Sequence, residues 1–158
     1  MADNADFSAF SKRELGKLAK TFTLMGDDAI EESKEVAFEI AKMAEEEIKQ
    51  AGYSRNVSAK GVRRVVDGVS VSRTSKTGRL SYGFANQRFS GGATTKQLWG
   101  AYEFGTKRND LKQFPRYSGN YGKGARGWFI YPTLRKIQPQ LTLKYISAMN
   151  KIVKKWAN

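Results

Sequence analysis

Two acidic side chains, Glu103 and Asp110, are the carboxylates whose placement most invites a catalytic interpretation. A pair of carboxylates is what glycoside hydrolysis needs. These two stand among many cations, which lower the pKa of a carboxyl group and so disfavour a general acid. In such a setting a glutamate is more often a structural partner for Lys or Arg. We therefore expect no enzyme activity and no catalytic residue.

The glycines at 122, 124 and 127 match the G-x-G-x-x-G pattern of dinucleotide-binding loops. That chemistry needs a preceding strand, a following helix and an acidic residue about 20 positions further on to bind the ribose. Here a polar loop comes before the glycines, Trp-Phe-Ile-Tyr-Pro comes after them, and no Asp or Glu occurs beyond Asp110. The pattern does not predict a nucleotide cofactor.

Cysteine and histidine are both absent from the 158 residues. Their absence excludes thiolate nucleophiles, disulfides, zinc sites of the Cys/His type and every Ser-His-Asp or Cys-His mechanism. With 40% hydrophobic and 27% charged residues, the composition is typical of a soluble globular protein. We expect neither a metal nor a cofactor.

The formal net charge of +13 is divided unevenly along the chain. Residues 1–50 carry 7 basic and 12 acidic side chains, whereas residues 51–158 carry 21 basic and 3 acidic ones. Such asymmetry indicates either a polyanionic partner or complementary faces on neighbouring subunits. The acidic N-terminus lacks the features of a signal peptide, and no apolar stretch is long enough to span a bilayer, so we expect no membrane association.

Basic and aromatic residues alternate between positions 107 and 128, which is typical of proteins that neutralise a phosphate backbone and stack on bases. No known nucleic-acid-binding motif accompanies them. Nucleic-acid binding by the 107–126 loop is therefore kept as an alternative function. The cations of this loop that we single out are Lys107, Arg108, Arg116, Lys123 and Arg126.

The elements that position these residues begin with a helical part at 8–51. Gly26 interrupts it, and Asp27 or Asp28 is predicted to cap a second, longer helix that Gly52 ends. The apolar residues of this helix recur at helical spacing. Its opposite face is acidic and is interpreted either as solvated or as docking on a basic surface of a neighbour, through Glu45, Glu46 and Glu47.

Residues 53–131 have the composition of strands and loops. Asp67-Gly68 between two valine-rich runs predicts a type I′ hairpin of 63–66 with 69–72, and a third strand is expected at 79–85. A C-terminal helix is predicted over 132–157, with Pro132 in its first turn and Pro139 starting or kinking a second segment. The predicted fold is a single α+β domain over 1–158, an antiparallel sheet of about four strands packed by the long N-terminal helix and the C-terminal helix.

The segment Tyr102-Glu103-Phe104-Gly105-Thr106-Lys107 carries a resemblance to a known family. It is similar to the Tyr/Val-Glu-Phe/Tyr-Gly-Thr segment of the tail-component or tail-completion proteins of long-tailed bacteriophages. The order of helices, strands, this motif, the element Trp128–Leu134 and a final helix also resembles that family. Independently of the family, Gly105 permits an unusual backbone turn, Phe104 can anchor it in the core, and Glu103 can bond the loop that follows.

The resemblance implies a non-enzymatic virion protein of the neck that forms a ring at the head–tail junction. Whether it is a tail terminator or a tail-completion protein stays open. The implied partners are other copies of the chain, as a hexamer or alternatively a dodecamer, together with neck and tail-tube proteins and the DNA in the channel. The implied location is the virion, and the host cytoplasm during assembly. Closed rings need two different patches on each subunit, and the acidic 27–50 face and basic 55–126 surface are the candidates.

Overall fold

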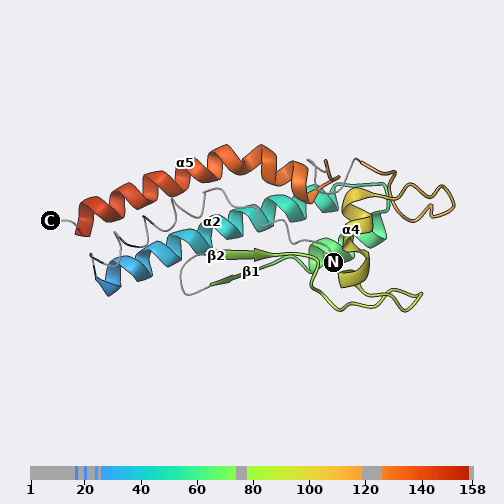
Figure 1. Cartoon of the computed structure of the whole chain (residues 1–158), viewed down its shortest axis with the longest axis horizontal. Coiled ribbons are helices and arrows are strands. Elements are labelled where there is room, and N and C mark those ends of the chain that lie inside the picture. Colours follow the sequence, from blue (N-terminus) through green and yellow to red (C-terminus); the bar gives the residue numbers. More distant parts are fainter. Residues whose placement is uncertain are drawn as a thin grey trace.

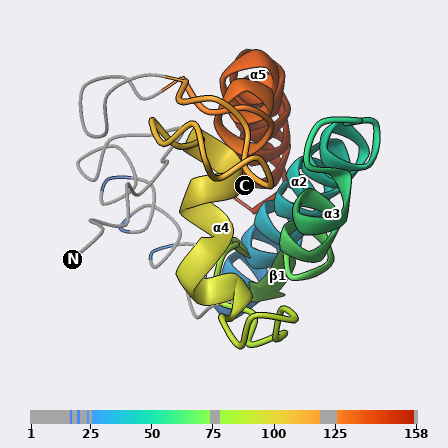
Figure 2. The same ribbon diagram turned by 90° about the vertical axis from the view of Figure 1, so that its right-hand side faces the viewer.

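The protein is described here by a computed structural model covering residues 17, 20, 24, 26–73, 78–118 and 126–156. Within these residues the elements follow the order α2 (Asp27–Tyr53), α3 (Ala59–Asp67), β1 (Ser70–Arg73), β2 (Gly78–Ser81), α4 (Thr95–Phe104) and α5 (Ile130–Trp156). Figure 1 shows α2 and α5 running antiparallel along an elongated molecule, with the strands beside α2. In the view along the length of the molecule, α3 and α4 lie at the end that faces the viewer (Figure 2).

The sheet is smaller than the sequence predicts. In the described residues it has two antiparallel strands, with Val71 paired to Leu80 and Ser70 to Ser81. The strand expected at 69–72 is present as β1, and the one expected at 79–85 is present only in part, because β2 ends at Ser81. The expected total of about four strands is wrong. The fold is still a mixture of helix and antiparallel sheet, with the two long helices as its largest parts.

The predicted type I′ hairpin at Asp67-Gly68 is wrong, because residues 59–67 form helix α3. Gly68 follows this helix with φ −87°, outside the left-handed region that a type I′ turn requires. Val62, Val65 and Val66 are fully buried and Val69 is 2% exposed. The three helical valines are spaced by three and four residues and so share one face of α3, and burial of that face outweighs the strand preference of valine.

The start and end of α2 lie within two residues of their predicted positions, for reasons other than those predicted. Gly26, with φ 94°, precedes the helix, and neither Asp27 nor Asp28 makes a side-chain cap. Gly52 does not end the helix, which continues to Tyr53. A Cβ at Gly52 would lie 2.3 Å from Cγ1 of Val66, so this glycine lets α2 and α3 approach closely.

Helix α4 is an element that the sequence did not reveal. It begins at Thr95, and the Thr94 N–H donates to Oε1 of Gln97 at 2.8 Å, half of a capping box. It ends at Phe104, where Gly105 has φ 79°. The motif singled out from the sequence therefore lies across the end of a helix.

The C-terminal helix is confirmed, beginning at Ile130 rather than Pro132 and ending at Trp156. Leu141, Met149 and Ile152 are buried and lie on one face of this helix. Pro139 lies inside the helix, where it lacks an N–H for the residue four positions earlier, and Figure 1 shows α5 arched. The N-terminal helical prediction before Gly26 lies almost wholly outside the described residues.

Two apolar clusters join the long helices. The larger one lies at the α3–α4 end and includes Ile48, Val62, Tyr102, Phe129 and Leu134. The smaller one joins the start of α2 to the end of α5 through Ala29, Met149 and Ile152. Each long helix is thus held near both of its ends.

We expect Gly52→Ala to destabilise the protein by about 1–3 kcal/mol, because the new methyl group overlaps Val66 in a packed core. Urea unfolding measures the change. Gly91→Ala is the matched control, since a Cβ there meets nothing within 4 Å and should change stability by less than about 0.5 kcal/mol. Equal stability of the two variants would contradict the close approach of α2 and α3.

Candidate functional site

The motif around Glu103 is a structural corner built on a buried carboxylate. Glu103 is fully buried at the end of α4. Its Oε2 accepts the N–H of Phe129 at 3.1 Å and that of Ile130 at 2.9 Å, and its Oε1 accepts the N–H of Tyr131 at 2.9 Å. These donors form the start of α5, where a carboxylate stabilises both the free N–H groups and the positive end of the helix dipole.

Two glycines make room for this arrangement. Gly127 has φ 68°, and a Cβ there would lie 2.0 Å from Oε1 of Glu103. Gly105 has φ 79°, and a Cβ there would lie 2.2 Å from the carbonyl oxygen of Arg116. Both positions combine a left-handed backbone with close contact, so any side chain is excluded for two independent reasons. The prediction that Gly105 permits an unusual turn is confirmed.

The other motif residues fasten the same corner. Tyr102 and Phe104 are 5% and 4% exposed, which confirms Phe104 as a core anchor. Thr106 donates its N–H to the carbonyl of Pro115 at 3.0 Å and accepts the N–H of Tyr117 at 3.1 Å. The loop after α4 is thereby folded back beside the motif. Glu103 bonds the start of α5 rather than a Lys or Arg side chain, so the expected pairing with a basic partner is wrong.

Burial raises the pKa of Glu103 to about 7, while the backbone N–H donors of Ile130, Tyr131 and Phe129 act in the opposite direction. The neighbouring cation is Arg55. Burial lowers the pKa of Arg55, and the charge of Glu103 opposes that shift. A fully buried carboxylate that already accepts three N–H groups cannot reach a substrate from the surface. This geometry gives Glu103 a positioning role for α5.

Arg55 is a residue of this region that the sequence did not single out. Its Nη1 donates to the carbonyl of Trp128 at 3.0 Å, and its guanidinium lies 5.0 Å from the centre of the Trp128 ring. The indole N–H of Trp128 donates in turn to the carbonyl of Arg116 at 2.7 Å. Arg55 and Trp128 are 73 positions apart, and no local pattern signals a contact at that separation.

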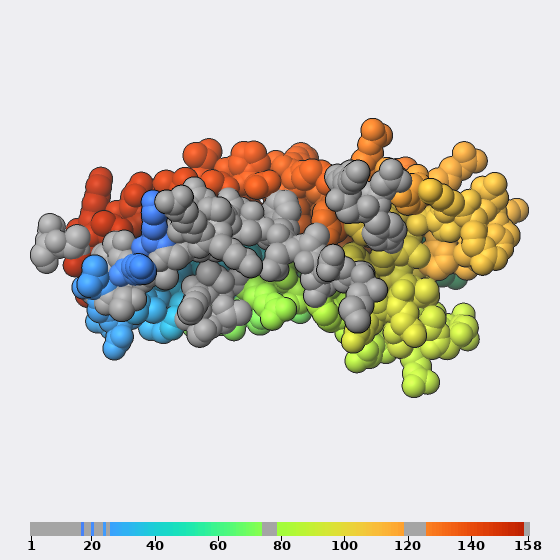
Figure 3. Space-filling view, in the orientation of Figure 1, coloured from blue at the N-terminus to red at the C-terminus, as the bar shows by residue number. Residues whose placement is uncertain are grey.

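The cations that the sequence singled out lie around this corner. Figure 3 shows the loops after β2 and α4 projecting at one end of the molecule. Lys107 and Arg108 are exposed, with the Lys107 ammonium 4.8 Å from the centre of the Tyr117 ring and Arg108 bonded through two nitrogens to Asp110. The side chains of Arg116 and Arg126 are also exposed. Lys123 lies outside the described residues.

The acidic face of α2 is partly neutralised by its own chain. Glu45 bonds Lys49 at 2.6 Å, one helical turn further on. Glu32 bonds Lys155 at 2.9 Å, and Glu35 pairs with Arg73. Glu46 and Glu47 are exposed and have no ion pair among the described residues. Of the three glutamates predicted for an interface, Glu46 and Glu47 are therefore the two that remain available to a neighbouring subunit.

No cluster of three acidic side chains suited to a metal ion occurs among the described residues. No described helix combines the length and apolar character needed to cross a bilayer. Comparison with protein-family models, with curated proteins and with solved structures finds no match to this chain.

The raised pKa of Glu103 predicts a pH dependence of stability. A carboxyl group whose pKa is about 7 when folded and 4.5 when unfolded binds more protons in the folded state between those values. Stability from this group is therefore fully present below about pH 4.5 and is lost as the pH rises through 7, by about 3 kcal/mol. Urea unfolding at a series of pH values measures this loss.

Glu103→Gln is the matched control, because glutamine is neutral and keeps one oxygen acceptor at the start of α5. The wild-type protein should lose stability relative to this variant as the pH rises from 4.5 to 8. Taking the difference cancels the titration of the surface carboxyl groups. Parallel stability curves for the two proteins would show that Glu103 titrates alike in the folded and unfolded states.

Proposed function

We propose that this chain is a non-enzymatic structural protein of the neck of a tailed bacteriophage, forming a ring at the head–tail junction. The supporting observation is the use that the fold makes of the Tyr102–Thr106 motif. Its carboxylate is wholly engaged with the backbone at the start of α5, and its aromatic residues are core. The segment most similar to the family thus acts as a scaffold corner, which suits an assembly protein better than an enzyme.

The charge distribution supports assembly by two unlike patches. Glu46 and Glu47 project from the second half of α2, while Arg116, Arg126 and Lys112 are exposed on or beside the loop after α4. A heterologous contact of one patch with the other on the next subunit generates a closed ring when the rotation closes. Six copies are the favoured number, and twelve would match a portal-like symmetry. Neck and tail-tube proteins are the proposed neighbours, first in the host cytoplasm and then in the virion.

Reversing Glu46 and Glu47 together to Lys should abolish ring formation and leave the subunit folded, since both side chains are exposed. Native mass spectrometry gives the copy number and negative-stain images show the ring. The control reverses Glu31 and Glu39, which makes the same change of charge in the first part of α2. If the wild type forms rings and both double variants do so equally well, these acidic residues are not the contact.

Nucleic-acid binding is the second candidate function, and a separate observation supports it. Trp128 is 40% exposed beneath the Arg55 guanidinium, and Tyr117 lies beneath the Lys107 ammonium. Paired cations and aromatic rings suit both phosphate neutralisation and base stacking. These contacts flank the loop that the sequence assigned to this role.

A salt titration with single-stranded and duplex DNA separates the two functions. Nucleic-acid binding is favoured if the monomer binds DNA and the logarithm of its affinity falls steeply with the logarithm of the salt concentration. In that case Trp128→Ala should weaken binding to single strands by about 1–3 kcal/mol, the usual value for one stacked base. A ring that has no affinity for DNA would favour the structural function.

A further inference from the structure

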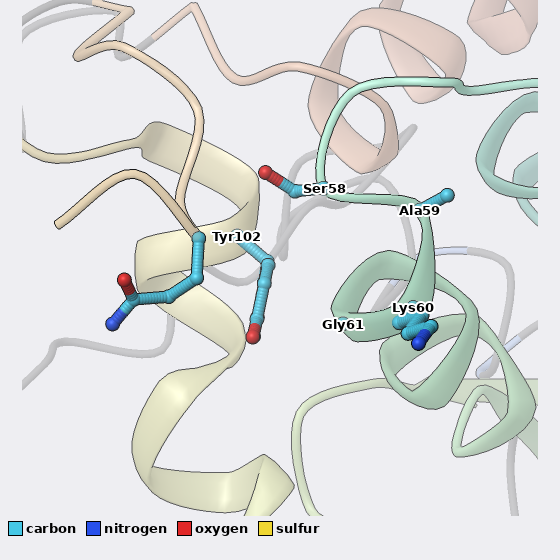
Figure 4. A pocket seen from close by; sticks show the side chains of 6 residues that line it. Ser58, Ala59, Lys60, Gly61 and Tyr102 are labelled. Carbon is cyan, nitrogen blue, oxygen red and sulfur yellow. The ribbon is translucent and has the colours of Figure 1, made fainter.

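A shallow hollow of about 300 Å³ lies between the first turn of α3 and the second half of α4. Figure 4 shows Ser58, Ala59, Lys60 and Gly61 on one side of it and Tyr102 on the other, with Gln113 of the loop after α4 completing the lining. These residues include one cation and no carboxylate. Tyr102 belongs to the motif, but its hydroxyl and the groups at the start of α3 take no part in the hydrogen bonds of Glu103.

The first turn of α3 offers free backbone donors at the hollow. The N–H groups of Gly61 and Val62 both donate to the carbonyl of Ser58 at 3.0 Å. Within the described part of the chain, the N–H groups of Ala59 and Lys60 have no acceptor. The start of a helix carries a partial positive charge in addition to these free donors, and Lys60 adds a full charge.

Tyr102 supplies a second, independent observation. Its side chain is 5% exposed, yet its hydroxyl has no hydrogen-bond partner in the described residues. The hydroxyl oxygen lies 2.4 Å from the position that a Cβ on Gly61 would occupy, so it rests against the first turn of α3. By contrast, the hydroxyl of Tyr82 donates to that of Tyr131 at 3.3 Å. The ring of Tyr102 is buried, whereas its hydroxyl keeps some accessible surface, and the hollow is its open side.

Two further features favour an anion at this place. The Oγ of Ser58 is buried and has no partner in the described residues, and Ser58 does not cap α3. The Arg64 guanidinium lies 4.7 Å from the centre of the Phe89 ring, which stacks on Tyr102 at 5.7 Å. The lining of the hollow is mostly apolar, and its polar groups are few. The Arg64 guanidinium adds positive charge nearby, and one of its nitrogens already donates to the carbonyl of Arg88. A neutral ligand would leave the charges of Lys60 and Arg64 unused.

We propose that this hollow binds a phosphate group. The free N–H groups of Ala59 and Lys60 and the hydroxyl of Tyr102 donate to its oxygens, and the ammonium of Lys60 balances its charge. Phosphate suits the site because its several oxygens can accept from donors that converge from a helix start and a side chain. The group comes either from a small phosphorylated ligand or from a nucleic-acid backbone. The proposal is independent of ring formation.

Calorimetric titration with inorganic phosphate at constant ionic strength tests the affinity, and ¹⁵N TROSY spectra of the same protein locate the site. We expect saturable binding with the largest amide shifts at Ala59 and Lys60. Tyr102→Phe keeps the ring and loses one donor, and it should weaken binding at least about fivefold, as one charge-assisted hydrogen bond predicts. Lys60→Ala should weaken it to a similar extent.

Lys151→Ala on α5 is the matched control, since it removes another exposed helical lysine far along the chain and should leave the affinity unchanged. Equal weakening by Lys60→Ala and Lys151→Ala would overturn the proposal by showing general charge attraction. The proposal would also be overturned if neither phosphate nor a 12-nucleotide single strand caused saturable amide shifts at Ala59 and Lys60. Matching shifts with the oligonucleotide identify a nucleic-acid source, and shifts with phosphate alone identify a small ligand.

Discussion

The buried carboxylate of Glu103 is the interaction on which the arrangement of the second half of the chain depends. It ends one helix and supplies the acceptors for the first N–H groups of another, 26 to 28 residues later. Burial of a charged carboxylate is costly, and the three donors together with the helix dipole offset only part of that cost, since the pKa of Glu103 stays raised. The glycines at 105 and 127 make room for this interaction, because a side chain at either position would displace the carboxylate or the loop beside it.

From this corner the rest of the architecture follows. Helix α5 leaves the corner and returns along α2, and the two are packed at one end around Ile48 and Leu134 and at the other around Ala29 and Ile152. The short hairpin and α3 complete the core without a large sheet. The loops after β2 and after α4 lie at the corner end (Figure 3). The loop after α4 carries exposed cations, and Lys107 and Arg55 lie over aromatic rings beside it. This surface is the one on which the proposed assembly and the proposed phosphate binding both depend.

Charge has three different uses in this molecule. The first is internal, at Glu103. The second is intramolecular pairing along α2, where Glu32, Glu35 and Glu45 meet cations of the same chain and lose their availability to a neighbour. The third is the remaining exposed charge, negative at Glu46 and Glu47 and positive around the loop after α4. The net charge of +13 hides this division, and only the exposed remainder is available for the proposed assembly.

The sequence by itself determined the two long helices, the hairpin strands, the absence of Cys and His chemistry, and the special backbone at Gly105, because these depend on local periodicity, composition and turn preference. It did not determine that the valines at 62, 65 and 66 belong to a helix, that residues 95–104 form another, or that Gly52 is a packing contact rather than a stop. It also left the partner of Glu103 and the contact of Arg55 with Trp128 unassigned. Tertiary structure decided these features. Whether a short valine-rich run becomes strand or helix depends on the surface that buries it. Contacts between residues 26 to 73 positions apart leave no local pattern in the sequence.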